Sequence, residues 1–369
     1  MLDFDWNPFD DSMLATASED TTLKLWSIPD DWEPTDEKGN SKAGENLNSS
    51  LVTLEGHGKK VTLCRFNPTV NNCIASTSSD LSVRVWDFEK AEQICSFTGM
   101  GDLSQDIVWD VRGDKLATSC KDKVVRFLDG RTGSVVQSIE GAHDGSKSVK
   151  LTFLGESNKF LTVGASRQSA REVKIWDLAN LEKPLHIEKI DNSAGVIMPM
   201  YDNDTKVLYM CGKGDGNIRN YEFEDRSPFV FRLSDYSSTT STKGVCMVPK
   251  RGNNVMACET MRLLKLTNSQ GVHPLSFTVP RKADSFQSDI FPDCPAPTPA
   301  HTVDEWLEGS SKLPVTMSLD PSSIGGTTKE KKTFVLRTVT SVTNELKEAE
   351  KRIKYLEEKL TQNGIEFDK

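Results

Sequence analysis

Short segments in which apolar and polar residues alternate recur through the first 280 residues of the chain. The clearest covers residues 81–86, where three aliphatic side chains alternate with others in the run LSVRVW. Two further segments of strand character precede it, at residues 61–66 and 73–77. Because successive side chains of a strand point to opposite faces, a period of two predicts half-buried strands. The pattern therefore predicts an all-β domain built from short antiparallel strands.

Two residue pairs bracket these three strands. A Gly-His pair ending at His57 precedes the first strand, a Trp-Asp pair beginning at Trp86 ends the third, and Asp80 stands six residues before Trp86. This arrangement is typical of a WD repeat, which forms one blade of a β-propeller. Hydrogen bonds from Trp86 through Ser76 and His57 to Asp80 would satisfy all four polar groups. We expect them to hold the blade together rather than to catalyse, because no nucleophile or metal-ligand pattern accompanies the His-Asp pair.

The interval of six residues between the aspartate and the tryptophan locates sister blades. It recurs from Asp20 to Trp26, and other residues replace the tryptophan at Leu128 and Tyr221. The blade that ends at Trp176 lacks the aspartate, so we expect its hydrogen-bond chain to differ. Most of these markers are separated by about one blade, which is about 40–45 residues, and they predict about six blades.

Both ends of the predicted propeller are irregular. The Gly-His pair that would open the first blade is missing, so we expect the chain to begin inside a propeller whose N-terminal blade is missing. We place the propeller at residues 1–280. Its last blade is degenerate, with strand-like segments at Lys243–Pro249, Val255–Glu259, Leu263–Thr267 and Leu275–Val279.

The pattern changes after residue 280. Residues 281–320 are proline-rich and predict an extension packed on the propeller, with a short helix capped by Thr302. We assign residues 321–332 to a linker. Residues 333–363 repeat apolar positions at alternating steps of four and three, which predicts a coiled coil. Its seam includes Val342, Leu346, Ile353 and Leu356. Because a lone helix would expose this stripe, we favour self-association over packing back on the propeller, and the seam alone leaves the number of strands open.

Composition excludes several function classes. The formal net charge of −9 argues against a nucleic-acid binder driven by overall charge. The eight cysteines form no Cys-x-x-Cys pair. This favours reduced thiols in a cytosolic protein over a disulfide framework or a zinc site. No apolar run is long enough to span a membrane. The five histidines form no ligand pair, so we expect no metal, no cofactor and no enzymatic activity.

At this point the chain resembles the coronin family. The resemblance rests on the blade series, on PKRG at 249–252 and TVPRK at 278–282, and on the segment DSFQSDIFPDCPAPTPAHTVDEWLEG. It also rests on the order of propeller, extension, linker and coiled coil. The resemblance implies a seven-bladed propeller, of which this chain holds about six blades. It further implies a cytoplasmic F-actin-binding protein of the cortical actin cytoskeleton that bundles filaments and regulates actin dynamics, with the branching Arp complex and cofilin as further partners.

The resemblance also bears on oligomeric state. Trimerising coiled coils of this family carry Arg, apolar, x, x, apolar, Glu, which matches Arg352, Ile353, Leu356 and Glu357 here. The resemblance therefore implies a parallel homotrimer in which Arg352 and Glu357 bridge neighbouring chains. The alternative interpretation is an exposed charge pair that contributes little to stability.

An acidic protein needs a local basic surface to bind an acidic filament. The blade pattern places lysines beside the His and Asp positions, and we call this set the lysine face: Lys59, Lys60, Lys121, Lys123 and Lys213. Ordinary solvated lysines are the alternative interpretation. The alternative function is a WD-repeat adaptor for ubiquitin-ligase or vesicle-coat assembly that does not bind actin.

Overall fold

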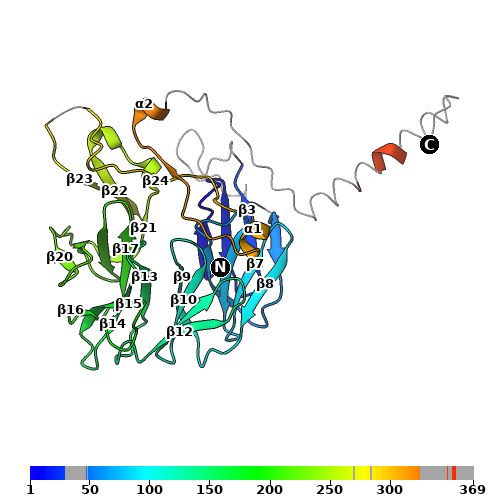
Figure 1. The fold of residues 1–369 in the computed structure, drawn as a ribbon, viewed down its shortest axis with the longest axis horizontal. Coiled ribbons are helices and arrows are strands. Elements are labelled where there is room, and N and C mark those ends of the chain that lie inside the picture. Colours follow the sequence, from blue (N-terminus) through cyan, green and yellow to red (C-terminus); the bar gives the residue numbers. More distant parts are fainter. Residues whose placement is uncertain are drawn as a thin grey trace.

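The computed structural model describes residues 1–29, 47, 49–268, 271–282, 285–324, 347 and 351–354. Within these residues, the part up to Thr278 forms six antiparallel sheets that follow one another from blue to yellow in Figure 1. The architecture is an all-β, six-bladed propeller, as the alternating pattern predicts.

The first three sheets each have four strands in sequence order. The first consists of β1 (Asp3–Trp6), β2 (Met13–Ala17), β3 (Leu23–Ser27) and β4 (Val52–Leu54). The second consists of β5 (Val61–Phe66), β6 (Cys73–Ser78), β7 (Val83–Asp87) and β8 (Glu92–Phe97). The third consists of β9 (Ser104–Trp109), β10 (Lys115–Cys120), β11 (Val124–Asp129) and β12 (Val135–Glu140).

The next two sheets repeat the four-stranded plan, and the sixth has three strands in the described part of the chain. The fourth consists of β13 (Lys150–Phe153), β14 (Lys159–Ala165), β15 (Arg171–Asp177) and β16 (His186–Asp191). The fifth consists of β17 (Ile197–Asp202), β18 (Val207–Gly212), β19 (Ile218–Phe223) and β20 (Val230–Arg232). The sixth consists of β21 (Thr242–Met247), β22 (Glu259–Thr267) and β23 (Val272–Thr278).

The core lies between successive sheets rather than in one central cluster. Ala15 and Leu25 of the first sheet pack with Val61 and Ile74 of the second, and all four are fully buried. Similar apolar clusters lie at the four later boundaries between sheets. Each blade therefore depends on its neighbours for the burial that stabilises it.

The first strands of the sheets lie side by side, from β1 through β5, β9, β13 and β17 to β21. Aspartates, one half-buried and one buried, join two of these boundaries. Asp5 accepts a hydrogen bond from the backbone N–H of Phe66 at 2.9 Å, and Asp106 accepts one from Leu151 at 2.9 Å. These carboxylates satisfy backbone donors that no strand pairs with, and so they align each blade with the next.

The sixth blade departs from the sequence prediction at one segment. Val255–Ala257 forms a 3₁₀ turn, η2, so the strand predicted over Val255–Glu259 is wrong. The side chain of Asn254 caps the turn by accepting from the backbone N–H of Ala257, and Cys258 takes a left-handed φ of 54°. Both features stop an extended chain, and they place the start of β22 at Glu259. A second 3₁₀ turn, η1, spans Lys250–Gly252.

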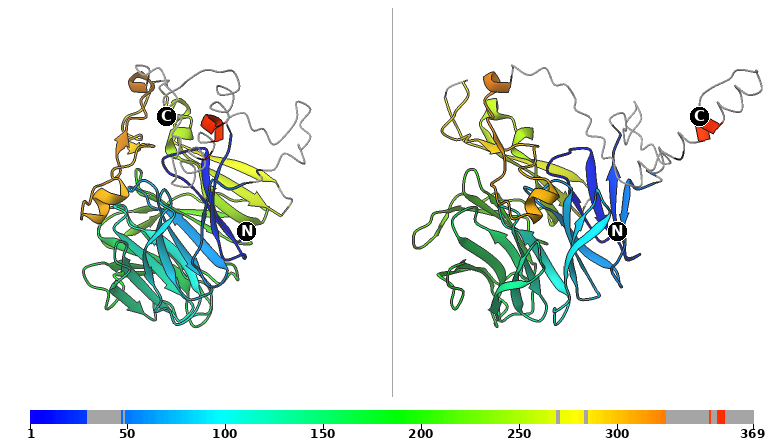
Figure 2. Two further views of the ribbon diagram at one scale, coloured as in Figure 1. Left: turned by 90° about the vertical axis from the view of Figure 1, so that its right-hand side faces the viewer. Right: turned by 45° about the vertical axis from the view of Figure 1, so that its right-hand side comes forward.

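The extension follows the sixth blade and lies along one side of the sheets (Figure 2). It contains β24 (Cys294–Pro295), which pairs with β25 (Thr316–Met317), and the helix α1 (Val303–Leu307). Thr302 caps α1, and the Glu305 side chain completes the capping box that the sequence predicts. Helix α2 (Pro321–Ile324) stands at the start of the predicted linker, whose residues 325–332 lie outside the described part.

Candidate functional site

The Gly-His loop, the Asp turn and the closing tryptophan of the second blade meet in one buried chain of polar contacts. Trp86 Nε1 donates to Ser76 Oγ at 2.8 Å, and Ser76 Oγ lies 2.8 Å from His57 Nε2. His57 Nδ1 lies 3.0 Å from Asp80 Oδ2. Ser76 is fully buried, so its hydroxyl is not accessible to a substrate. The arrangement ties the loop before β5 to the β6–β7 turn.

Burial and hydrogen bonding set the ionisation of His57 and Asp80. Burial lowers the pKa of His57 more than the hydrogen bond and charge of Asp80 raise it. Burial also opposes ionisation of Asp80, yet hydrogen bonds from Ser82 and Gly58 hold the pKa of its carboxyl well below the ordinary value. A neutral imidazole beside an ionised carboxylate is a stable pair of hydrogen-bonding partners here.

The fourth blade builds the same chain with a different acid. Trp176 Nε1 donates to Thr162 Oγ1 at 3.0 Å, and Thr162 Oγ1 lies 2.9 Å from His143 Nε2. Glu172, on β15, lies 3.0 Å from His143 Nδ1 and takes the place of the aspartate that this blade lacks. The sequence predicts that the hydrogen bonds of this blade differ, but it does not show which residue supplies the carboxylate.

A buried arginine joins the fourth and fifth blades. Arg171 is 1% exposed and pairs with Asp191 at 2.5 Å and with Asp215 at 2.6 Å. Arg219 of the fifth blade shares Asp191 at 2.6 Å. The turn aspartate Asp215 therefore binds an arginine rather than a histidine, which the sequence interpretation missed.

Two other blades use shorter versions of the polar chain. Trp26 Nε1 donates to Thr16 Oγ1 at 2.9 Å, while Asp20 accepts from the Thr22 hydroxyl at 2.6 Å. In the third blade, Arg126 pairs with Asp122 at 2.7 Å. The position six residues before the closing residue thus stays a hydrogen-bond acceptor while its partner changes.

All five residues of the lysine face are exposed. Lys59 and Lys60 lie in the loop between β4 and β5, and Lys213 lies in the β18–β19 turn. Lys121 and Lys123 lie in the β10–β11 turn, on either side of Asp122. Lys121 and Lys123 line one cavity together with Lys147, which the sequence interpretation did not select. The cavity does not include the other three lysines of the face.

Two other pairs of adjacent basic residues occur at 250–251 and 281–282, and three of their four side chains have acidic partners. Lys250 is 2.5 Å from Asp202 in a buried ion pair. Arg251 pairs with Asp11 in the loop between β1 and β2, and Arg281 pairs with Asp289 at 2.6 Å. These cations are compensated within the chain and offer less charge to a partner than the lysine face does.

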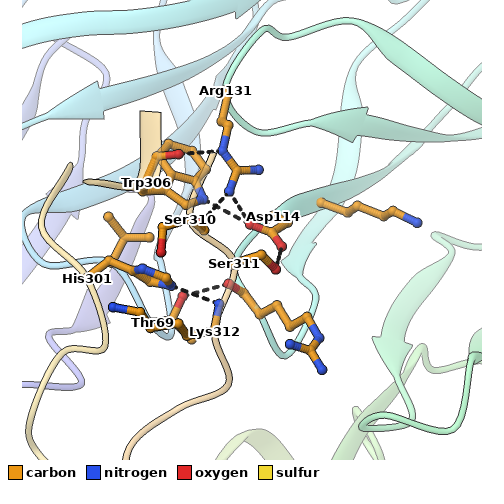
Figure 3. A network of polar contacts seen from close by, with 12 residues as sticks. Thr69, Asp114, Arg131, His301, Trp306, Ser310, Ser311 and Lys312 are labelled. Carbon is orange, nitrogen blue, oxygen red and sulfur yellow. Dashed lines mark hydrogen bonds and ion pairs between the residues drawn. The ribbon is translucent and has the colours of Figure 1, made fainter. Parts of the chain in front are cut away.

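The extension is attached to the third blade by one polar and aromatic network (Figure 3). Trp306 is fully buried, and its Nε1 donates to Asp114 at 3.1 Å. Arg131 stacks 4.8 Å over the Trp306 ring, donates to its carbonyl at 2.7 Å and pairs with Asp114 at 2.7 Å. His301 Nε2 accepts from the backbone N–H of Lys312 at 3.0 Å. No local pattern singles out Arg131 or Asp114, because they lie far from Trp306 in sequence.

Part of the predicted coiled coil is described. Residues 351–354 are helical and exposed, and Ile353 is 55% exposed. Arg352 lies in the same turn. The other predicted seam and bridging positions lie outside the described residues: Val342, Leu346, Leu356 and Glu357.

Among the described residues, no group of three or more His, Cys, Asp or Glu side chains could hold a metal ion. All eight cysteines are free thiols, and only Cys246 is exposed. Within the described part, no helix has the length and apolar character needed to cross a membrane.

Comparisons with known proteins fit this architecture. A family described as "WD domain, G-beta repeat" matches residues 2–27 and 48–87, and "Type of WD40 repeat" matches residues 272–314. The crystal structure of the WD40 domain from Toxoplasma gondii coronin superposes with a TM-score of 0.80 and 33% identity, covering 87% of this chain and 80% of that one.

The chain belongs to the coronin family. Human Coronin-2A is 38% identical over 330 residues, which are 88% of this chain and 60% of the relative. The Coronin-like protein crn1 of Schizosaccharomyces pombe is 38% identical over 319 residues, 85% of this chain and 51% of the relative. This coronin chain thus spans about half to three-fifths of the length of these curated relatives. The resemblance predicted from the sequence is confirmed.

A more distant match shows the fold alone. A chain in the crystal structure of a Mitotic Checkpoint Complex superposes with a TM-score of 0.56 at 16% identity, covering 75% of this chain and 76% of that one. It supports a propeller and carries no argument about function.

Proposed function

We propose that this chain binds actin filaments through its propeller and bundles them by self-association through its C-terminal helix. The observation that carries the proposal is membership of the coronin family. Filament organisation, rather than catalysis, is the role that a propeller with buried polar chains and exposed loops suits best.

The lysine face supplies the filament contact in this proposal. The chain carries 54 acidic and 45 basic residues, so a filament of like charge would repel most of its surface. Exposed lysines on loops of the second, third and fifth blades would form a local attractive surface. Such a contact is weak, and it weakens further as salt is added.

Self-association multiplies this weak contact. Three linked binding sites raise avidity by about 10²–10⁴ when geometry permits simultaneous binding. In the proposed parallel homotrimer, Ile353 and Leu356 form the seam, while Arg352 and Glu357 bridge neighbouring chains. A trimer would carry three lysine faces and could hold more than one filament.

The remaining partners follow from the same family. We propose that the chain acts in the cytoplasm at the cortical actin cytoskeleton, where it works with the branching Arp complex and with cofilin to regulate filament turnover.

The coiled-coil part of the proposal is tested by the double variant Ile353→Ala/Leu356→Ala. It should give a monomeric mass by light scattering, keep weak pelleting with filaments at high speed, and lose bundling measured by low-speed pelleting. Lys354→Ala, in the same turn but off the seam, should behave as wild type. Bundling by a variant shown to be monomeric would refute this mechanism.

A further inference from the structure

A cavity of about 230 Å³ lies between the third and fourth blades. Its walls come from Gln105 on β9, from the β10–β11 turn, and from the loop at residues 143–149 that leads into β13. It is far larger than the roughly 30 Å³ that one water occupies, and smaller than the roughly 300–1,000 Å³ of pockets for drug-sized ligands. The space suits one or two small ionic groups.

The lining of this cavity is strongly cationic. This lining includes three lysines, Lys121, Lys123 and Lys147, and no carboxylate. His143 is also part of the wall, and burial lowers its pKa, so it adds no charge at neutral pH. Gln105 and Ser146 add neutral polar groups that can donate hydrogen bonds to an anion.

Three acidic residues that neighbour the lining have cationic partners of their own. Arg126 pairs with Asp122 at 2.7 Å, Lys150 with Asp106 at 3.2 Å, and Lys174 with Glu172 at 3.2 Å. Asp144 is exposed and turns its backbone carbonyl, rather than its carboxylate, to Lys123. No carboxylate stands inside the cavity to cancel the charge of its lysines.

Two of these lysines are held in place by neutral acceptors. Lys147 Nζ donates to the carbonyls of Ser169 at 2.8 Å and Ser193 at 2.6 Å, and Lys123 Nζ donates to the carbonyl of Asp144 at 2.8 Å. An ammonium group has three N–H donors, so Lys147 keeps one and Lys123 keeps two for a ligand. Side chains fixed before binding lose less entropy when the ligand arrives.

We propose that this cavity binds the phosphate group of a phosphorylated anion. A phosphate carries close to two negative charges near neutral pH and several strong acceptor oxygens, which three lysines match better than they match a single carboxylate. The site goes beyond filament binding and does not depend on it. If the lysine face also contacts filaments, a bound phosphate would compete with them for Lys121 and Lys123.

Titration calorimetry with sodium pyrophosphate at constant ionic strength tests the site on the full chain. We expect saturable binding of one pyrophosphate per chain. Lys121→Gln/Lys147→Gln should weaken it at least tenfold, whereas Lys59→Gln/Lys60→Gln, with the same change in charge outside the cavity, should bind as wild type. Lys147 donates to two backbone carbonyls, so replacing it could also disturb the fold. Lys121→Gln alone is therefore the second variant, because its side chain is exposed and can be neutralised without disturbing the fold. We expect it to weaken pyrophosphate binding about threefold or more.

Two results would overturn the proposal: no saturable binding to the wild type, or equal weakening in the cavity and control variants. A flotation assay with vesicles containing a phosphatidylinositol phosphate distinguishes the source of the phosphate. Co-flotation that Lys121→Gln abolishes assigns the cavity to a lipid headgroup. Pyrophosphate binding without co-flotation assigns it to a soluble phosphorylated compound.

Discussion

Replacement of Trp306 by alanine tests whether the extension is an energetic part of the propeller. Trp306 of α1 is fully buried against the second and third blades, where its ring meets Trp109 edge-on at 6.3 Å. It also lies under the guanidinium of Arg131. Truncation would therefore remove a large apolar side chain and leave a cavity that the rigid sheets fill poorly.

The expected loss follows from that burial. Truncating a buried tryptophan to alanine costs about 3–5 kcal/mol of unfolding free energy. Asp114 would lose the indole N–H, but it would keep Arg131 and the Ser311 hydroxyl as partners. No carboxylate would be left unpaired, so the loss should stay within this range rather than exceed it.

Urea denaturation followed by circular dichroism measures the change, since the substitution removes a fluorophore. Limited proteolysis should also cut the extension faster in the variant. Leu307→Ala is the matched control, because Leu307 is the next residue on α1 and is 44% exposed, and it should change stability by less than about 0.5 kcal/mol. A Trp306→Ala protein as stable as the control would refute the idea that the extension stabilises the blades.

Two further predictions concern the buried polar chains. Thr162→Val removes the acceptor for Trp176 and the partner of His143, so it should lower unfolding free energy by about 1–3 kcal/mol in urea; an unchanged midpoint would contradict this. The pKa values of His57 and His143 are lowered in the folded state, so their stabilising effect is complete above the unfolded value near 6.5 and is lost as pH falls toward the folded values. In parallel urea titrations between pH 7 and pH 5, the wild type should therefore lose stability relative to His143→Gln, by at most about 1.4 kcal/mol per pH unit.

The strands could be predicted from the sequence because alternation and the Asp-to-Trp interval are local signals. The segment at residues 83–87 illustrates this, since its aliphatic residues must face one side for the blade to pack. The strand predicted over Val255–Glu259 failed for a local reason too. Asn254 and the left-handed Cys258 favour a capped turn, and apolar residues alone do not reveal that competition.

The partners in the polar chains could not be predicted in the same way. Glu172 reaches His143 only because of its position on β15, and Arg171 meets Asp215 across a blade boundary. The contact of Trp306 with Asp114 joins residues 192 positions apart. Such contacts depend on how sheets pack, which a pattern along the chain does not encode.

The lysines that line the cavity between the third and fourth blades could be predicted only in part from the sequence. Lys121 and Lys123 lie beside a recognisable turn aspartate, so the blade pattern selects them. Lys147 follows no such marker, and it joins them only because the loop before β13 folds over the boundary between two blades.

The most direct test of the central claim is co-sedimentation with actin filaments after charge reversal. The double variants Lys59→Glu/Lys60→Glu and Lys121→Glu/Lys123→Glu change the lysine face. Lys183→Glu/Lys189→Glu makes the same change in net charge at exposed positions in the β15–β16 loop and on β16. We predict that each lysine-face variant weakens filament binding by at least about tenfold, more at low salt than at high salt, while the control binds as wild type. Wild-type binding by both lysine-face variants, or equal loss in the control, would contradict the account.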